Sequence, residues 1–216
     1  MRANVLRGVV ACGVAVVLAA GNGRARAVEL GAYIAPGYTF NSMDVTRAQM
    51  DATFEEFIGL PFDSASLDRN VRGYSLAVGY QLTRNFAVEG AWLNLGKLKY
   101  DFTFTDETGQ LAGRFTSRRS GMAFAGVGSL PLGPYFSVEG RVGALFGEDK
   151  QRIGVPEAGY EGGYNDSETS MFFGVGATWF VTPYTGIHAG VTRYKKGALN
   201  SDIDQLSIGF RYSYGY

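Results

Sequence analysis

Residues 206–216 alternate between bulky apolar side chains and small or polar ones without a break. The bulky set occupies every second position: Leu206, Ile208, Phe210, Tyr212, Tyr214 and Tyr216. A period of two places this set on one face of a β-strand and the serines, glycines and Arg211 on the other. Because the apolar face is largely aromatic, the stretch predicts a lipid-facing strand that closes a membrane barrel.

Seven further segments alternate in the same way. A membrane-spanning strand needs about 9–11 residues, and the eight segments reach that length: 28–40, 70–82, 85–104, 111–130, 135–148, 168–181, 184–196 and 204–216. Tight turns (82–85, 130–134, 181–184) alternate with longer connections (41–69, 105–110, 149–167, 197–203). Short inner turns and longer outer loops are typical of outer-membrane barrels. The sequence therefore predicts an all-β fold, an eight-stranded antiparallel up-and-down transmembrane β-barrel.

Residues 1–27 have the pattern of a secretory signal peptide. A basic start precedes an apolar run of about 13 residues, and Ala25-Arg26-Ala27 gives the small-residue cleavage pattern. We expect residues 28–216 to form the exported barrel domain. Removing 1–27 takes away four arginines and no acid, which leaves 16 basic and 20 acidic residues, a net charge of −4 that argues against a nucleic-acid partner. Cys12 leaves with the signal, so we expect no disulfide.

The first long connection contains a helical pattern. Between 44 and 59, an apolar stripe at helical spacing comprises Met50, Phe54, Phe57 and Ile58. Thr46 and Gln49 have the spacing of a capping box. We predict a short helix that packs over the mouth of the barrel, with a partner-binding helix as the alternative.

Five ionisable residues share the strand face opposite the bulky apolar side chains: Glu89, Glu139, Arg141, His188 and Arg211. A lysine or arginine that faces lipid at mid-membrane costs about 2–4 kcal/mol, so this face must point into the barrel. All five lie at a similar distance from an inner turn or the end of the last strand. They predict a charge network in the barrel interior.

Several segments resemble the outer-membrane protein A type of eight-stranded transmembrane domain, in the outer-membrane β-barrel superfamily. They are Gly31-Ala-Tyr-Ile-Ala-Pro-Gly-Tyr38, Val88-Glu-Gly-Ala-Trp92, Trp179-Phe-Val-Thr-Pro183 and the last strand. The pattern from Ser207 to Tyr214 is also similar to the C-terminal signal that the barrel assembly machinery reads. The resemblance implies the barrel fold and insertion by that machinery. Members often carry a peptidoglycan-binding domain after the barrel, and we expect none here.

The residues favour no catalytic, cofactor or metal site. His188 is the single histidine, and residues 189–192 after it include no serine. A lipid-A-modifying hydrolase, with Glu89 or Glu139 as its acid, would need such a group within reach and access to lipid. One histidine with scattered carboxylates also lacks the spacing of metal ligands.

Basic residues gather near the expected outer ends of the strands. Lipopolysaccharide phosphates lie at this level, and arginine and lysine bind phosphate well. The candidate contacts are Arg118, Arg119, Arg193 and Lys195. The alternative is ordinary rim charge that marks the end of the hydrocarbon layer.

Together these patterns predict a non-enzymatic, porin-like protein of the bacterial outer membrane. We expect a monomer in contact with membrane lipid and lipopolysaccharide, with a structural role or one in surface interaction through the outer loops. A narrow ion or solute pore and a lipid-A-modifying hydrolase are the alternatives. A soluble lipocalin-like barrel would turn its apolar face inward, whereas here the charged face must be inside.

Overall fold

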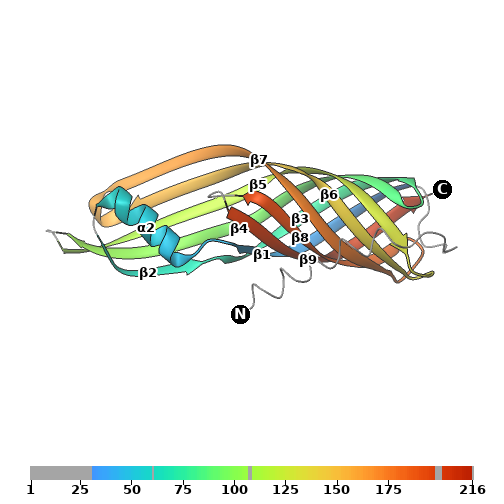
Figure 1. Cartoon of the computed structure of the whole chain (residues 1–216), viewed down its shortest axis with the longest axis horizontal. Coiled ribbons are helices and arrows are strands. Elements are labelled where there is room, and N and C mark those ends of the chain that lie inside the picture. Colours follow the sequence, from blue (N-terminus) through green and yellow to red (C-terminus); the bar gives the residue numbers. More distant parts are fainter. Residues whose placement is uncertain (1–30, 60, 107–108, 198–200, 216) are drawn as a thin grey trace.

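A computed structural model describes residues 31–59, 61–106, 109–197 and 201–215 (Figure 1). The expected signal peptide and Tyr216 lie outside these ranges. The elements in chain order are β1 (Gly31–Met43), α2 (Arg47–Ile58), β2 (Phe62–Asp68), β3 (Asn70–Thr83), β4 (Phe86–Asp106), β5 (Gly109–Pro131), β6 (Phe136–Val155), the 3-10 helix η1 (Pro156–Ala158), β7 (Tyr160–Phe180), β8 (Thr185–Gly197) and β9 (Ser201–Gly215).

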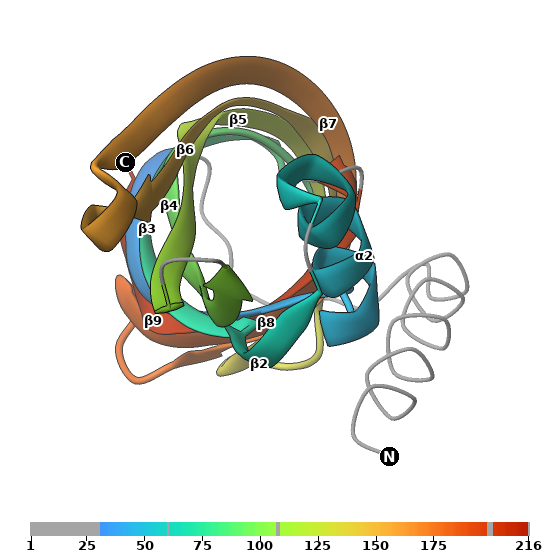
Figure 2. The ribbon, with the colours of Figure 1, turned by 90° about the vertical axis from the view of Figure 1, so that its left-hand side faces the viewer.

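Eight strands close into an antiparallel ring, which Figure 2 shows end-on. The order is β4-β3-β1-β9-β8-β7-β6-β5, and β5 pairs with β4 to complete the circle. The first and last strands pair from Gly31 opposite Gly215 to Met43 opposite Ile203. A closed ring leaves no unpaired strand edge in lipid, and it confirms the predicted eight-stranded barrel.

The two ends of the barrel differ. Three tight turns lie at one end, between β3 and β4, β5 and β6, and β7 and β8, as predicted. At the other end the prediction of a long loop over 149–167 is wrong, because β6 continues to Val155 and β7 begins at Tyr160. These extensions carry few apolar residues, so apolar and polar residues do not alternate clearly enough to indicate a strand. The backbone ladder nevertheless continues to the pair Val155–Tyr160.

The predicted helix is present as α2. The Thr46 hydroxyl accepts a hydrogen bond from the Gln49 N–H, and the Thr46 N–H donates to the Gln49 side chain at 2.9 Å, which forms the predicted capping box. The helix ends at Gly59, whose φ of 78° is left-handed and therefore favours glycine. Met50 is buried and Phe54 is half-buried, whereas the side chains of Phe57 and Ile58 lie outside the description.

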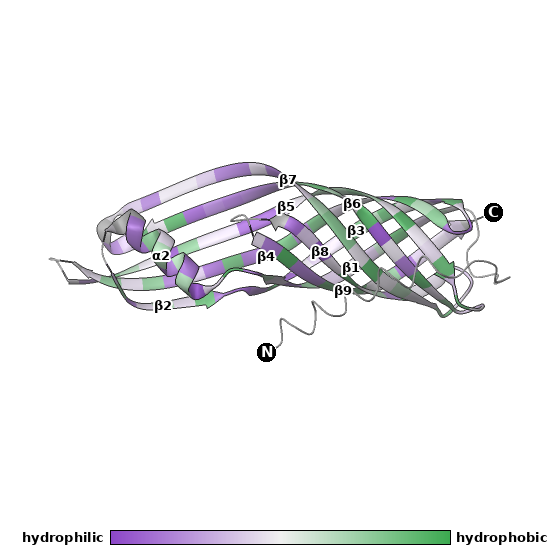
Figure 3. Ribbon diagram, in the orientation of Figure 1, coloured by the Kyte–Doolittle hydropathy of each residue, from purple (hydrophilic) through white to green (hydrophobic). Residues whose placement is uncertain are grey.

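Hydrophobic residues concentrate in the half of the barrel nearer the tight turns, where most of the green in Figure 3 lies. Val78, Phe124 and Val142 are each more than half exposed, whereas Glu139 and Arg211 inside the ring are 2% and 5% exposed. Apolar residues outside and charges inside are the arrangement of a barrel in lipid. No helix among the described residues is long and apolar enough to cross a membrane.

Candidate functional site

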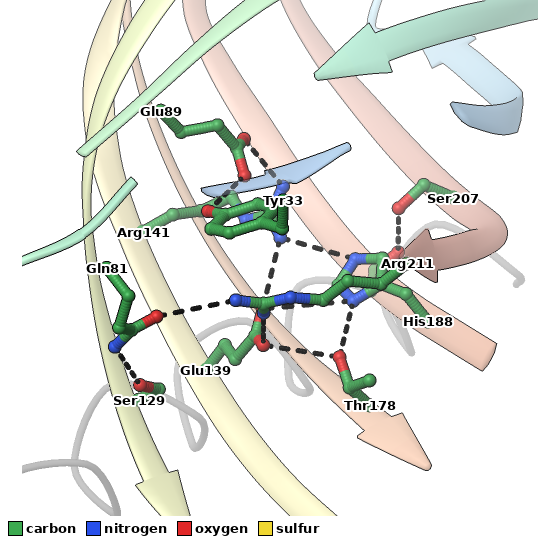
Figure 4. Close-up of polar contacts among 11 residues, drawn as sticks. Tyr33, Gln81, Glu89, Ser129, Glu139, Arg141, Thr178, His188, Ser207 and Arg211 are labelled. Atoms are coloured by element: carbon green, nitrogen blue, oxygen red, sulfur yellow. Dashed lines mark hydrogen bonds and ion pairs between the residues drawn. The ribbon is translucent and has the colours of Figure 1, made fainter. Parts of the chain in front are cut away.

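Glu139 lies at the centre of the interior charge network shown in Figure 4. Its side chain comes from β6 and contacts the Arg211 guanidinium of β9 and, at 3.6 Å, the Arg141 guanidinium. The Thr178 hydroxyl donates a third contact at 3.2 Å. One buried carboxylate thus faces two cations and a hydroxyl, which is the environment that a buried charge requires.

Glu89 and Tyr33 extend the network across the barrel. Arg141 contacts Glu89 of β4 at 3.5 Å, and the Tyr33 hydroxyl of β1 donates to Glu89 at 3.0 Å. The Arg211 guanidinium lies 3.8 Å from the centroid of the Tyr33 ring, a cation–π contact. Residue 79 on the neighbouring strand is glycine, and a Cβ there would collide with the Tyr33 ring. Gly79 therefore provides the space that this ring occupies.

His188 has a defined tautomer in this network. Its Nε2 lies 3.2 Å from Arg141 Nη2, and a guanidinium can only donate. Nε2 therefore accepts, which leaves the proton on Nδ1, 3.3 Å from the Thr178 hydroxyl oxygen. Thr178 in turn donates to Glu139. The five residues predicted from parity thus lie in one connected cluster.

The side chains of this network occupy most of the barrel interior at their level and leave only a small cavity. They line a cavity of about 50 Å³, which is room for a few water molecules. In the described part of the chain, no group of three histidine, cysteine or acidic side chains could hold a metal ion. The arrangement can hold charge and polarise a few waters, and its contacts are those of a packed interior.

A second group of cations lies on the outer surface, just beyond the apolar band. We name Lys97, Lys99, Arg118, Lys150 and Arg152 the basic face. All five are exposed. Arg118 of β5 stands directly between Lys97 of β4 and Lys150 of β6 in the strand register. Lys150 also contacts the Glu148 carboxylate at 3.4 Å, so the row of three cations carries one nearby acid. Like charges directly opposite each other repel, so the remaining positive charge of this row favours a bound anion.

The remaining candidates for lipopolysaccharide contact are placed differently. Arg119 is a correction: it is 1% exposed and points into the barrel, where it donates to Ser170 at 2.6 Å. Neighbouring residues of a strand face opposite sides, so Arg118 and Arg119 cannot both face the outside. Arg193 is paired with Asp204 by two bonds of 2.5–2.6 Å, and Lys195 with Asp202 at 2.7 Å.

The outer half of the barrel contains an aromatic cluster closed on one side by α2. The Phe54 ring lies 5.5 Å from Tyr100, 5.9 Å from Phe102 and 5.0 Å from Phe115, between ring centroids. The Tyr100 hydroxyl donates to Asp51 of α2 at 2.5 Å. Burial, and then this hydrogen bond to a carboxylate, raise the pKa of Tyr100 above its ordinary value. The cluster therefore attaches α2 to β4 by both packing and a hydrogen bond.

A groove of about 1200 Å³ runs beside this cluster, between α2 and the extended parts of β6 and β7. Its apolar lining includes Met50, Phe54, Phe115, Ile153 and Tyr164. Tyr164 is 64% exposed, although its face of the strand points toward the aromatic cluster. The groove is thus a concave, partly apolar surface at the end of the barrel opposite the tight turns.

Sequence reasoning missed several polar residues of the interior. Tyr33, Gln81 and Thr178 join the charge network, and Gln81 accepts from Arg211 at 3.4 Å. Farther from the tight turns, Gln205 donates to Asn41 at 3.0 Å. All of them lie on the inward-facing positions of their strands, so the same parity that identified the charged residues could have found them.

Comparisons with known proteins agree with this geometry. Residues 38–215 match the family described as OmpA-like transmembrane domain. Among solved structures, Ail, the attachment invasion locus protein of Yersinia pestis, in complex with the heparin analogue sucrose octasulfate, gives a TM-score of 0.53 at 19% identity, covering 87% of this chain and 100% of that chain. The outer membrane protein OprG of Pseudomonas aeruginosa gives 0.54 at 10% identity, covering 89% and 100%. No curated protein matches. At these identities the structural likenesses establish the fold alone.

Proposed function

Because the chain belongs to the OmpA-like transmembrane domain family, we propose that it is a non-enzymatic β-barrel protein of the bacterial outer membrane. On this proposal it is exported by its N-terminal signal, inserted by the barrel assembly machinery, and monomeric. Its role is structural, with surface interaction through the half of the barrel beyond the apolar band.

The observation that carries the proposal is the position of the basic face. The apolar band ends on β5 and β6 at Met122 and Phe146, which are about half exposed. Arg118 and Lys150 follow four residues farther along their strands. At about 3.3 Å per residue and a tilt near 40°, that is roughly 10 Å above the hydrocarbon. Phosphate groups of lipopolysaccharide lie in this zone, so we propose that the row Lys97–Arg118–Lys150 binds them.

The interior supports a role without catalysis. Both ring nitrogens of His188 are engaged, by Arg141 and by Thr178. The histidine also lies inside the ring, away from the lipid that a lipid-A hydrolase would have to reach. The proposal therefore assigns His188 to the interior network.

The test is the thermal shift that lipopolysaccharide gives to the full chain in detergent. We expect the variant Lys97→Gln/Arg118→Gln/Lys150→Gln to lose at least about half of the wild-type shift, because charge-assisted bonds to phosphate are lost. Lys195→Gln is the matched control and should retain the shift, since Lys195 contacts Asp202 at 2.7 Å, a closer pair than the 3.4 Å between Lys150 and Glu148.

Two further arms identify the source of the anion. Dephosphorylated lipopolysaccharide should give a smaller shift with the wild type. Sucrose octasulfate tests a sulfated polysaccharide, and a shift with that compound alone would replace lipopolysaccharide as the partner. Equal lipopolysaccharide shifts in the wild type and the triple variant would refute phosphate binding by this row.

A further inference from the structure

The extended part of β7 is paired on one side. β7 pairs with β6 from Tyr160 to Trp179, whereas its pairing with β8 covers Phe172–Phe180. Over Tyr160–Ser167, β6 is the single partner among the strands that the structure describes. In Figure 1 this part of β7 extends well beyond the end of β8. A strand edge of this kind presents backbone N–H and C=O groups that can pair with another chain.

The opposite edge of the same curved sheet is covered. β2 pairs with β4, and α2 packs against β2. The Glu55 carboxylate of α2 accepts the backbone N–H of Phe62 at 3.0 Å, which occupies a donor of that edge. Residues 160–167 of β7 include neither proline nor lysine, the residues that commonly block such an edge. Among the described residues, the β2 edge of this sheet is therefore covered by α2, whereas the β7 edge over 160–167 has no such cover.

The groove described above lies next to the open edge. Tyr160 and Tyr164 of β7 line it on one side, and Met50 and Phe54 of α2 line it on the other. A strand added to β7 would place every second side chain toward this groove and the others toward solvent. The groove thus provides apolar contacts in the register that an added strand requires.

We propose that the β7 edge over Tyr160–Ser167 binds an extended segment of a partner polypeptide as an additional strand. The segment has apolar residues at alternate positions and carries lysine or arginine. Acidic groups near the edge and groove are Glu56, Glu161 and Asp166. Among the described residues, the nearby cations belong to β6: Arg152 lies at the margin of the groove, and Lys150 pairs with Asn165 on the outward face. These acids favour a basic segment and disfavour a second copy of the same edge. The inference rests on the proposed function in placing this half of the barrel outside the cell.

A synthetic peptide of alternating valine and lysine, carrying a fluorophore, tests this directly by anisotropy with the full chain in nanodiscs. Methylation of alternate backbone nitrogens in the peptide should weaken binding roughly tenfold, because ladder hydrogen bonds are lost. A peptide of the same composition with its valines in one block should bind more weakly for lack of the strand period. Equal binding of the methylated peptide would overturn the proposal.

A matched pair of variants locates the site. Tyr164→Lys places a cation in the groove and should lower affinity at least about tenfold. Asn165→Lys makes the same change on the opposite face of the strand and should alter affinity less than about twofold. Heat-modifiable migration confirms that both variants are folded. A Tyr164→Lys variant that binds the peptide as tightly as the wild type would refute binding at this edge.

Another occupant would give a different pattern. Failure of the alternating peptide to bind overturns the proposal, and dimers of the full chain that Tyr164→Lys dissociates would assign the edge to a second copy. The lipopolysaccharide shift depends on the basic face and not on Tyr164. Failure here with an intact lipopolysaccharide shift would therefore remove the strand-binding edge and leave the proposed function in place.

Discussion

Glu139 compensates two cations in a space that lipid surrounds. It contacts Arg211 and Arg141, and both of its partners are largely buried. Breaking a buried pair by removing one partner commonly costs about 3–5 kcal/mol, because a charge is left uncompensated. Glu89 compensates Arg141 alone, and its other contact is the neutral Tyr33. The two carboxylates therefore differ in how many charges depend on them.

We expect Glu139→Gln to lower the free energy of unfolding by about 3 kcal/mol or more, and Glu89→Gln by clearly less. Urea unfolding of the full chain in lipid vesicles measures both. Combining Glu139→Gln with Arg211→Gln should recover part of the loss, since the stranded cation is removed as well. Equal losses for the two single variants would contradict the central role of Glu139.

The alternation of residues along each strand predicted which charged residues face inward, because a charge that faces lipid is too costly and the charged face must therefore be the inner one. It could not predict which acid meets which arginine, since that depends on strand register and barrel shear. Arg119 shows the other limit. Its position near the strand end suggested a contact with lipopolysaccharide, yet its face of β5 points inward to Ser170. Applying the strand period to every basic residue would have separated it from Arg118.

At the scale of elements, the half of the barrel that contains α2 was predicted only in part: the helix was predicted, and the strand extensions beside it were not. The helix was predicted because caps and an apolar stripe are local signals. The extensions of β6 and β7 were not, because few of their inward-facing residues are apolar and hydropathy hardly alternates along them. What holds α2 in place is non-local: the Phe54 ring in the aromatic cluster and the Tyr100–Asp51 hydrogen bond.

This attachment should weaken in alkali. The pKa of Tyr100 is raised above its ordinary value of 10.0 by burial and by its bond to Asp51. The unfolded or detached form therefore ionises first, so the stabilisation is complete below about pH 10 and is lost as the pH rises toward the higher pKa. A fluorophore on an Ala48→Cys variant should show falling anisotropy from about pH 10 upward.

Tyr100→Phe is the control for this effect. It lacks both the ionisable group and the bond, so we expect looser attachment of α2 by about 1 kcal/mol and a flat anisotropy between pH 9 and 11, values chosen to bracket the ordinary pKa of about 10. A pH response that survives in Tyr100→Phe would show that another group is responsible.

Over the whole molecule, side chains fill the barrel at successive levels. The charge network lies nearest the tight turns, and Leu145 and Phe172 are buried in the next layer. The Gln205–Asn41 hydrogen bond and the aromatic cluster beneath α2 fill other parts of the interior. Eight-stranded barrels have room for side chains and little more. A continuous water path would need several of these layers to open together.

We therefore expect the full chain to give no steady conductance in planar bilayers. Glu139→Ala and Arg141→Ala should remain silent as well, because the layer of Leu145 and Phe172 stays in place. Stable single-channel steps in the wild type would favour the pore, and steps that appear in Arg141→Ala alone would identify the network as its gate.

The pairing of β1 with β9 also sets an order of events. Gly31 meets Gly215 only when strands at opposite ends of the barrel sequence come together, and a contact so distant along the chain forms late. Arg211 belongs to β9 and Glu139 to β6, so their ion pair forms when β9 joins the barrel. Before β9 pairs, Glu139 has only one of its two arginine partners, Arg141. Closure of the barrel supplies the second, Arg211, and the ion pair therefore favours completed assembly.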